Sequence, residues 1–520
     1  MLGIDTPAPR AVPSDAVAVA LGSVIGSSSA QSVILVGILM ALGLGAARLA
    51  EHIGEGLGVA PQLVALTAAV WNPLVRDRLL LGQWTILLGV AVLPWALRAC
   101  LRIIRQDKGR WPLSTLIVLA GLGGANTLTM VAISVLSLMG VEAVRRRVGL
   151  ADALIPLGVV MGMAAVWALP ALVGRVVSRE SGAHVFAPVA DTPFGVIGSL
   201  VSGGAVWNTA VHAPSRSVVV VSAVAAVMAL VAVVIMVRYA SVRRQVGLIS
   251  AVGLPTVLVL LSAVPVAQPL WSWLVTALPG GGILRDSQKL IAAWVITSAV
   301  GLALATEGVR RHWVPVRGPV TVLLVLAPVA LSPLLAWGAG GQLSPVQVPE
   351  SYRHSVDRLN QLPPGDVGIL PWNQYRRYGW NDERISLTLM PRLVDRVVVY
   401  DDSLPLRGGV VAGESDRAAT VTRLRENGVR DLEAFADVGV RYVAVERDAM
   451  GSETAQLDPA GDGFHTVIDD PDLMVVDLGT GQQPSNAATP TVIAGWFIFG
   501  LTAVAVGITG FLARLRREEL

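Results

Sequence analysis

Long apolar runs separated by short basic segments constrain this chain more than any other feature. About 20 predominantly apolar residues cross a bilayer as one helix. Runs that approach this length lie near residues 31–50, 58–73, 80–103, 112–124, 126–143, 151–174, 217–237, 247–266, 288–306, 318–338 and 489–513. Of the 520 residues, 53% are hydrophobic and only 15% are charged. We therefore predict a mainly α, polytopic membrane helix bundle of about 11 spans in a lipid bilayer.

Three of these runs are marginal as spans. The run 58–73 is short for a span. A glycine-rich break at 121–124 separates the run 112–124 from the run 126–143. The last two runs form either a tight hairpin or one bent element.

Clusters of arginine and lysine set the expected orientation. If the runs alternate, five clusters share one face: Arg98, Arg102, Arg105, Lys108 and Arg110; Arg145, Arg146 and Arg147; Arg238, Arg243 and Arg244; Arg310, Arg311 and Arg317; and Arg514, Arg516 and Arg517. The positive-inside rule makes that face cytoplasmic. We therefore expect a plasma-membrane protein whose tail, 514–520, is cytoplasmic and whose N-terminus is outside.

Two segments fall outside the bundle of runs 31–338. Residues 1–30 are too polar to span, and Ser14 or Asp15 is expected to cap a short helix along the outer membrane surface. Residues 339–488, before the final span 489–513, are more charged and read as an extracytoplasmic domain. Strands are expected at 367–370, 397–400, 442–445 and 473–476, with helices at 351–361, 415–427 and 430–438. This alternation predicts a small α/β domain.

Composition excludes several classes of function. The net charge is +3, and the arginines fall where topology requires them, so no nucleic-acid surface is expected. Cys100 is the one cysteine, which rules out a disulfide within the chain and a cysteine-based metal site. The six histidines show no ligand spacing, and no nucleotide-binding glycine motif follows the expected strands.

The segment 279–289 is the first candidate site. Three consecutive glycines allow close backbone approach to a ligand, and Arg285, Asp286, Gln288 and Lys289 follow at the threshold of a helix. Cations beside a helix N-terminus suit a phosphate, because free backbone N–H groups add to the side-chain charge. The alternative is an interfacial turn whose charges stop the helix at the headgroups.

An aromatic segment, 371–382, is the second candidate site. Its aromatic side chains alternate with amides, arginines and an acid: Trp372, Asn373, Tyr375, Trp380 and Asp382. Aromatic faces stack on sugar rings, and amides and carboxylates pair with hydroxyls. These residues would bind an acceptor glycan. The alternative is a loop that packs its aromatics onto the membrane domain or the headgroups.

Short motifs along most of the chain carry a resemblance to a known family. They are Trp71-Asn72-Pro73, Gly82-Gln83-Trp84, Arg285-Asp286-Ser287-Gln288-Lys289 and Gly439-Val440-Arg441-Tyr442-Val443-Ala444-Val445-Glu446. The chain resembles actinobacterial multi-pass glycosyltransferases of the GT-C type, and in particular the large arabinofuranosyltransferases of the mycobacterial cell wall. The resemblance implies a polyprenyl-phosphate sugar donor, an outer glycan acceptor and an inverting transfer.

The resemblance also implies roles for the charged residues. Arg285 and Lys289 would bind the lipid phosphate, Asp286 would orient Arg285 or meet a sugar hydroxyl, and Arg76 and Arg78 would be secondary phosphate contacts. Some relatives use a divalent metal, although no ligand set is visible in this sequence.

The catalytic base is harder to assign from the sequence. In the family the acid lies in the first outer loop, after the first membrane helix, and we expect that helix and most of that loop to precede Met1. Asp5 and Asp15 are the remaining candidates. For Asp15 we expect the role of a helix cap ahead of that of a base. Two rivals to a glycosyltransferase stay open: a non-catalytic lipid-glycan binding or cell-envelope assembly protein, and a lipid or polysaccharide exporter. The scarcity of charge within the spans disfavours an exporter.

Overall fold

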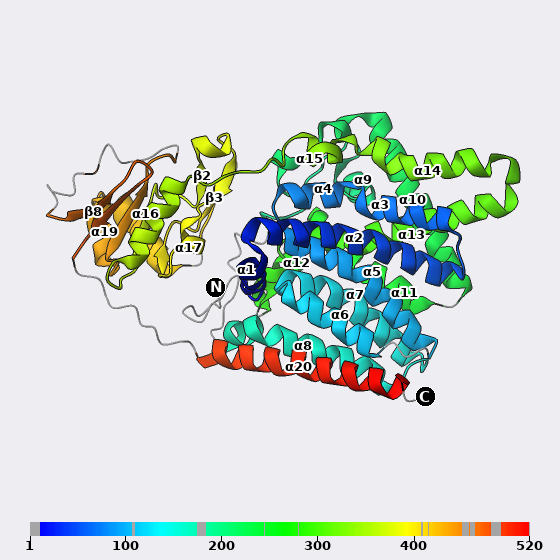
Figure 1. The fold of residues 1–520 in the computed structure, drawn as a ribbon. Helices are drawn as coiled ribbons and strands as arrows, with labels where there is room; N and C mark the ends of the chain where they lie inside the picture. Colours follow the sequence, from blue (N-terminus) through cyan, green and yellow to red (C-terminus); the bar gives the residue numbers. More distant parts are fainter. Residues whose placement is uncertain are drawn as a thin grey trace. The chain divides into compact units, whose positions relative to one another are not determined.

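The computed structural model describes residues 11–106, 110–173, 184–243, 245–278, 280–406, 409–413, 415–449, 457, 463–479 and 490–518. Of the residues singled out above, Asp5, Lys108, Arg244 and Pro279 lie outside these ranges. The chain forms two compact units (Figure 1). Unit 1 comprises Met1–Leu343 and Ala488–Leu520, and unit 2 comprises Ser344–Ala487.

Unit 1 is built from long apolar helices. Eight in the described part of the chain are long and apolar enough to cross a membrane. They are α2 (Ser27–Gly54), α5 (Trp84–Ile104), α7 (Ala125–Val144), α8 (Leu150–Val173), α10 (Val219–Val242), α11 (Val246–Ala263), α13 (Ala292–His312) with the preceding 3-10 turn η6 (Ser287–Ile291), and α20 (Pro490–Glu518). The protein is therefore a multi-pass membrane protein, as expected.

The expected count of about 11 spans is not confirmed. Runs 58–73 and 112–124 form α3 (Val59–Val70) and α6 (Arg110–Leu122), of 12 and 13 residues. At 1.5 Å per residue, neither covers a hydrocarbon core of about 30 Å. Run 318–338 breaks into α14 (Arg317–Leu331) and a second piece, Pro333–Gly340, which are bent by 68°. Counting this bent pair as one span raises the number of candidate spans to nine.

The remaining helices of unit 1 are short. They are α1 (Ser14–Ile25), α4 (Pro73–Leu80), α9 (Gly195–Val201), α12 (Gln268–Ala277) and α15 (Ala336–Gly340). The predicted side-chain cap of α1 is wrong, because Pro13 occupies the N-cap position. The Ser14 hydroxyl instead donates to the Ala11 carbonyl at 2.9 Å, and Asp15 lies in the first turn.

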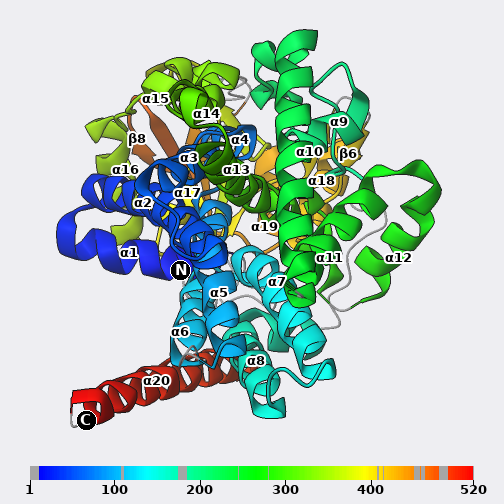
Figure 2. The ribbon, with the colours of Figure 1, turned by 90° about the vertical axis from the view of Figure 1, so that its right-hand side faces the viewer.

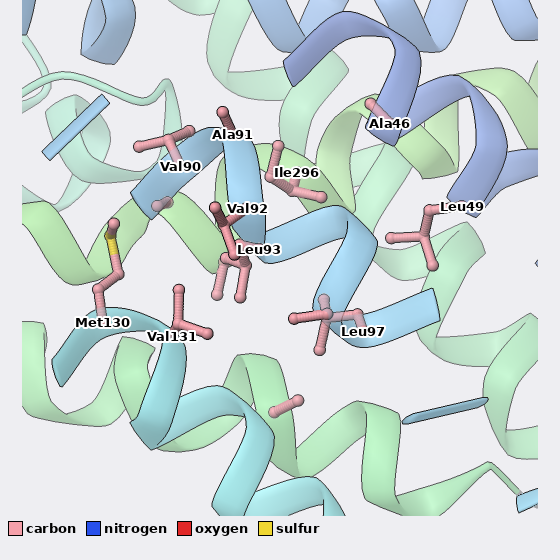
Figure 3. Packing of buried hydrophobic residues seen from close by; sticks show 14 of the residues in the cluster. Ala46, Leu49, Val90, Ala91, Val92, Leu93, Leu97, Met130, Val131 and Ile296 are labelled. Carbon is pink, nitrogen blue, oxygen red and sulfur yellow. The ribbon is translucent and has the colours of Figure 1, made fainter. Parts of the chain in front are cut away.

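The core of unit 1 lies around α5, which packs on α2 and α7. Figure 3 shows Leu93 and Leu97 of α5 between Leu49 of α2, Val131 of α7 and Ile296 of α13. Elsewhere α20 packs along α8 (Figure 1), and α10 packs along α13 (Figure 2). Most of the buried apolar residues of the bundle therefore form one cluster.

Ion pairs show which helix ends share a face. Glu55, which follows α2, pairs with Arg105 at the end of α5 (3.2 Å) and with Arg243 at the end of α10. The C-terminal ends of α2, α5 and α10 therefore lie together. Alternation of the runs places these ends on one face only if the chain also crosses between α2 and α5, where α3 is 12 residues long.

Unit 2 is an α/β unit with a five-stranded sheet, and the expected strand positions are occupied. The strands are β1 (Val367–Leu370), β4 (Val398–Val399), β7 (Tyr442–Glu446), β8 (His465–Asp469) and β9 (Leu473–Asp477), in the order β4-β1-β7-β9-β8. Strand β1 is parallel to β4 and β7, whereas β9 is antiparallel to β7 and β8. The inner strands read as continuous apolar runs because residues on both faces of the sheet are buried.

Helices and hairpins complete unit 2. The helices are α16 (Glu350–Gln361), α17 (Met390–Leu393), α18 (Asp416–Glu426) and α19 (Asp431–Asp437), and the hairpins pair β2 (Tyr375–Arg377) with β3 (Ile385–Leu387) and β5 (Leu404–Leu406) with β6 (Gly409–Val411). One apolar cluster contains Tyr352 and Val356 of α16, and a second contains Val421 of α18 and Phe435 of α19.

Candidate functional site

A layer of charged residues lies within unit 1, and most of its side chains are buried. We call this set the polar layer: Arg76, Asp77 and Arg78 of α4, Asp191, Arg216 of the 3-10 turn η3 (Pro214–Ser217), and Arg285, Asp286, Gln288 and Lys289 around η6. Four segments supply it: α4, the loop before α9, η3 and the region of η6. Buried charges are rare unless they are paired, so each partner matters.

Helix α4 carries three consecutive charged residues whose side chains are buried. Asn72 caps the helix by accepting a hydrogen bond from the Val75 N–H at 3.1 Å, and Pro73 occupies the first turn. Arg76, Asp77 and Arg78 are each at most 3% exposed. Successive helical residues point about 100° apart, so the three side chains reach different partners.

Arg78 and Asp286 form the first of these pairs. The Arg78 guanidinium donates to the two Asp286 carboxylate oxygens at 2.5 and 2.9 Å, and also to Gln83 and Gln288. Burial alone would raise the pKa of Asp286, but the charge and hydrogen bonds of Arg78 outweigh it and hold that pKa below its usual value. The expectation that Asp286 orients Arg285 is therefore not met, because Arg78 occupies that carboxylate.

Lys289 and Gln288 are also bonded within the protein. The fully buried Lys289 ammonium donates to Asn126 Oδ1 at 2.7 Å and to the Ile283 carbonyl, and Gln288 Nε2 donates to the Gly204 carbonyl at 2.8 Å. Asn126 lies in the first turn of α7. The structure thus brings Asp286, Gln288 and Lys289 together, but their hydrogen bonds go to neighbouring protein groups.

Gly281 of the 279–289 segment serves backbone packing. A Cβ on Gly281 would lie 2.6 Å from the carbonyl oxygens of Leu274 and Val275 on α12. The close approach predicted for a ligand is therefore made by α12. Arg285 donates from Nε to the Gly282 carbonyl at 3.2 Å, and its guanidinium lies 5.8 Å from the centre of the Phe186 ring.

Arg216 and Asp191 form the second pair. Two guanidinium nitrogens of Arg216 donate to the Asp191 carboxylate at 2.6 and 2.9 Å, and one of them also donates to the Ser202 hydroxyl. The Ser199 hydroxyl accepts the N–H groups of Asp191 and the following threonine. Both side chains of this bidentate pair are buried, and two parallel hydrogen bonds fix the orientation of one on the other.

Asp77 is the carboxylate of the polar layer that has an unsatisfied oxygen. Its Oδ1 lies 3.3 Å from the Arg76 guanidinium, whereas its buried Oδ2 has no hydrogen-bond partner. Burial raises the pKa of Asp77 to about 7, and the Asp191 carboxylate adds to that shift. Arg216, Arg76 and Arg78 oppose it. A carboxyl group of this kind exchanges a proton near neutral pH.

An apolar groove of about 90 Å³ ends at the polar layer. Its walls come from α10, α13 and α14: Val221, Ala225, Met228, Ala229, Val295, Ala299, Leu302, Pro328 and Leu331. Its polar end contains Trp71, Asn72, Ser202 and Arg216, and the Trp71 indole donates to the Ser332 carbonyl at 2.8 Å. This combination of an apolar trough and a charged end suits an amphiphilic ligand with an anionic head.

A smaller cavity of about 10 Å³ adjoins the groove. Its lining includes Asp77 and Ser215, and it shares Pro73, Arg216 and Ser332 with the groove. The groove and the cavity that Asp77 lines are therefore neighbours with shared lining residues.

Asp15, the base candidate from the sequence, lies in a different segment. Helix α1 packs against α2, whereas the polar layer comes from α4, η3 and the region of η6. The Val12 carbonyl oxygen lies 3.2 Å from where a Cβ on Gly124 would be, two residues before the Asn126 that binds Lys289. The start of α1 is thus near the Lys289 end of the polar layer.

Metal ligands show no clustering in the part of the chain that the structure describes. Within those ranges, no group of three or more histidine, cysteine, aspartate or glutamate side chains lies close enough to hold an ion.

The aromatic segment of unit 2 is packed from within. Trp372 donates to the Thr422 hydroxyl at 2.9 Å and meets the Phe435 ring edge-on, and Trp380 stacks on Tyr378 with ring centroids 4.4 Å apart. These contacts are within unit 2, so the segment's packing partner is its own unit.

The polar members of that segment are also engaged. Asn373 accepts the Tyr375 N–H at 2.9 Å, and Asp382 pairs with Arg384 at 3.3 Å. Asp382 is exposed, and Tyr375 and Trp380 are half-buried. Burial raises the pKa of Tyr375.

A buried carboxylate anchors the aromatic segment. Glu446 on β7 accepts from the hydroxyl groups of Tyr352 (2.6 Å) and Tyr378 (2.8 Å) and from Arg376 Nε (2.5 Å). Burial and the Glu446 charge raise the pKa of Tyr378, so both phenols stay protonated donors. Glu446 therefore ties α16, the 371–382 segment and the sheet together.

Sequence reasoning missed three residues of the site. Asp77, Asp191 and Arg216 were not selected as candidates, although Asp77 lies between Arg76 and Arg78 in a short segment bounded by apolar runs. Three adjacent charges so close to membrane helices were the available signal. The Arg216–Asp191 pair left no such signal, because its members lie 25 residues apart in a polar loop.

Comparisons with known proteins agree with the architecture. The cryo-EM structure of arabinofuranosyltransferase AftD from Mycobacteria matches with a TM-score of 0.58 at 15% identity, over 89% of this chain and 35% of that chain. A structure of a mutant of the same protein matches with a TM-score of 0.56 at 14% identity, over 89% of this chain and 36% of that chain. No family model matches the chain, and no curated protein matches it in sequence. The chain thus has an AftD-like GT-C fold and spans about a third of the length of those structures.

Proposed function

We propose that the chain is a membrane glycosyltransferase that moves a sugar from a polyprenyl-phosphate donor to an extracytoplasmic cell-envelope glycan. The observation that carries this proposal is the apolar groove that ends at the polar layer, on a fold resembling that of a membrane arabinofuranosyltransferase. The groove would hold the first isoprene units of the donor, and the phosphate would lie beyond its polar end, which Arg216 lines, among the other cations of the polar layer.

The charge of the polar layer suits an anionic headgroup. Five cations, Arg76, Arg78, Arg216, Arg285 and Lys289, stand against three carboxylates, Asp77, Asp191 and Asp286, which leaves an excess of two positive charges when all are ionised. Arg285 and Lys289 remain the proposed phosphate ligands, with Arg76 and Arg78 as secondary contacts. Lys289 would exchange the Ile283 carbonyl for a phosphate oxygen.

The proposed orientation follows from the charge clusters. The face that carries Glu55, Arg105 and Arg243 would be cytoplasmic, together with the C-terminal tail. The polar layer and unit 2 would then be extracytoplasmic. In unit 2, Trp380 and Asp382 are the members of the aromatic segment best placed to meet an acceptor glycan.

Transfer in proteoliposomes tests the proposal. Purified full-length chain would be supplied with a radiolabelled polyprenyl-phosphoryl arabinofuranose, or in parallel a mannose donor, and an oligosaccharide acceptor. We expect labelled acceptor to form, and Ala229→Phe, which fills the groove from α10, to abolish it.

A matched variant controls for damage to the helix. Val227→Phe lies on the same helix, but this residue is 60% exposed and is not part of the groove. It should leave the rate of transfer unchanged. Equal loss in both variants, or transfer unaffected by Ala229→Phe, would count against a donor in this groove.

A second candidate function is a non-catalytic lipid-glycan binding or assembly protein. It is favoured by the pairing of Arg78 with Asp286 and of Arg216 with Asp191, which leaves those charges fully engaged. Photo-crosslinking of a polyprenyl-phosphate probe, blocked by Ala229→Phe and accompanied by no product with any donor, would support binding without transfer.

A further inference from the structure

Asp77 is buried and has one oxygen without a hydrogen-bond partner. The transfer proposed above gives this residue no role. Of its two carboxylate oxygens, Oδ1 faces Arg76 at 3.3 Å and Oδ2 has no partner. A buried polar atom left unpaired costs stability, so such an atom in a native site needs an explanation.

The 10 Å³ cavity beside Asp77 supplies one. Its lining includes Ser215, whose hydroxyl oxygen is also buried and unpaired. Two residues that each have an unsatisfied buried oxygen thus line one space about the size of a single hydroxyl group or water molecule. A guest hydroxyl in this cavity could donate to Asp77 Oδ2 and accept from Ser215.

The position of the cavity fits a reaction centre. It shares Pro73, Arg216 and Ser332 with the groove assigned above to the donor. A sugar attached to a phosphate at the polar end of that groove would therefore have one face toward the cavity. The guest hydroxyl and the anomeric carbon would meet where the cavity and the groove adjoin.

We infer that Asp77 is the general base of the transfer and that the cavity between Asp77 and Ser215 receives the acceptor hydroxyl. This inference rests on the proposed function. The acceptor oxygen forms a bond to the anomeric carbon while its proton passes to Asp77 Oδ2. The bond from that carbon to the phosphate oxygen breaks, and its electron pair leaves with the polyprenyl phosphate, whose added negative charge the cations of the polar layer stabilise.

The electrostatic surroundings of Asp77 suit this role. The charged groups that face it are Arg76 and Arg78 on its own helix, Asp191 from the loop before α9, and Arg216 from η3. Burial and Asp191 raise the pKa of Asp77 to about 7, so the carboxylate is available at neutral pH and still accepts a proton readily.

Access to Asp77 depends on segment 332–342, because Asp77 is only 1% exposed. Leu334 of this segment lines the cavity, and the Gln342 side chain accepts from Arg76 at 3.3 Å. Movement of this segment would admit the acceptor.

The test compares Asp77→Asn with Asp15→Asn in the full-length chain. We expect Asp77→Asn to lower kcat by about 10²–10⁴-fold, the usual contribution of general acid–base catalysis, while photo-crosslinking of the donor changes by less than about twofold. Asp15→Asn should keep most of the activity. In the parent chain, kcat should rise with pH and level off above about pH 7, and Asp77→Asn should remove this dependence.

Ser215→Ala is the second variant, in case Asp77→Asn does not fold. It leaves the carboxyl group in place and should raise KM for the acceptor several-fold with little change in kcat. Activity within tenfold of the parent in Asp77→Asn, or an unchanged acceptor KM in Ser215→Ala, would refute the assignment while the glycosyltransferase proposal stands. No transfer by the parent with any donor would defeat both proposals.

Discussion

The Arg78–Asp286 pair gives the most direct test of what the polar layer does in the absence of a ligand. Changing Arg78 to methionine removes both hydrogen bonds to Asp286 and those to Gln83 and Gln288. Breaking a buried ion pair by removing one partner costs about 3–5 kcal/mol, because the other charge is left without compensation. The Asp286 side chain retains 18% exposure, so water offsets part of this loss and we expect about 3 kcal/mol.

The double variant separates pairing from burial. Asp286→Leu alone should destabilise unit 1 by a similar amount, since it leaves the fully buried Arg78 charge unpaired. Arg78→Met combined with Asp286→Leu should recover most of the loss, because an apolar pair of similar volume replaces two charges. The coupling energy of the cycle, which is the sum of the two single losses minus the loss in the double variant, should therefore be about 4–5 kcal/mol and favourable.

Unfolding in mixed micelles of increasing SDS content, followed by tryptophan fluorescence, measures these free energies. Arg48→Met is the matched control, because Arg48 pairs with Glu51 at 2.9 Å on an exposed surface and should cost no more than about 1 kcal/mol. Parent-like stability of Arg78→Met, together with loss of donor binding, would show that Arg78 is a ligand-binding group. The structural interpretation of the pair would then be wrong.

Three further measurements follow from the packing, the electrostatics and the topology. Gly301→Ala should cost about 1–3 kcal/mol of unfolding free energy, because its Cβ would lie 2.0 Å from a backbone carbonyl oxygen of α10, whereas Gly308→Ala on the same helix meets nothing within 4 Å and should be neutral. The pKa of Asp77 is raised from 3.8 to about 7, so the folded state holds this proton more tightly than the unfolded state. The free energy of unfolding of unit 1 should therefore fall by up to about 1.4 kcal/mol per pH unit as the pH rises from 4 to 7. Asp77→Asn should remove that slope. With the native cysteine replaced by alanine, an impermeant thiol reagent should label Ser351→Cys on intact cells and Arg145→Cys only after permeabilisation; the reverse pattern would invert the orientation.

The parts of the fold that were predictable from the sequence are those with a local signal. Strands β1, β7 and β9 are continuous runs of apolar residues bounded by turn residues, and both their faces are buried, so composition alone marks them. The long spans have enough apolar residues to be recognised by length. Helices α3 and α6 are short, as the marginal runs 58–73 and 112–124 indicated, because Trp71-Asn72-Pro73 and the 121–124 glycines end them.

The sequence predicted where charged residues of the site lie, but not which residues pair with one another. Arg285, Asp286 and Lys289 are recognisable by their charge at a helix threshold, and the structure does bring Asp286 and Lys289 into one cluster. Their partners cannot be inferred locally, since Arg78 and Asp286 lie 208 residues apart and Lys289 and Asn126 lie 163 apart. Asp77 shows the same limit: its distinguishing property is an unpaired oxygen beside a cavity, which only the tertiary arrangement creates.

The energetics of the polar layer argue that it serves a ligand. Replacing a buried ion pair with packed apolar side chains is often neutral or stabilising, so pairs such as Arg216–Asp191 are weak evidence for a purely structural role. Helix α4 places three adjacent charges in a short segment where apolar residues would be cheaper to bury, and one of them, Asp77, keeps an unsatisfied oxygen. One cation of the layer, Arg216, lies at the polar end of an apolar groove. An amphiphile with an anionic head would satisfy both features at once, whereas a headgroup-level helix stop would require neither the groove nor the cavity beside Asp77.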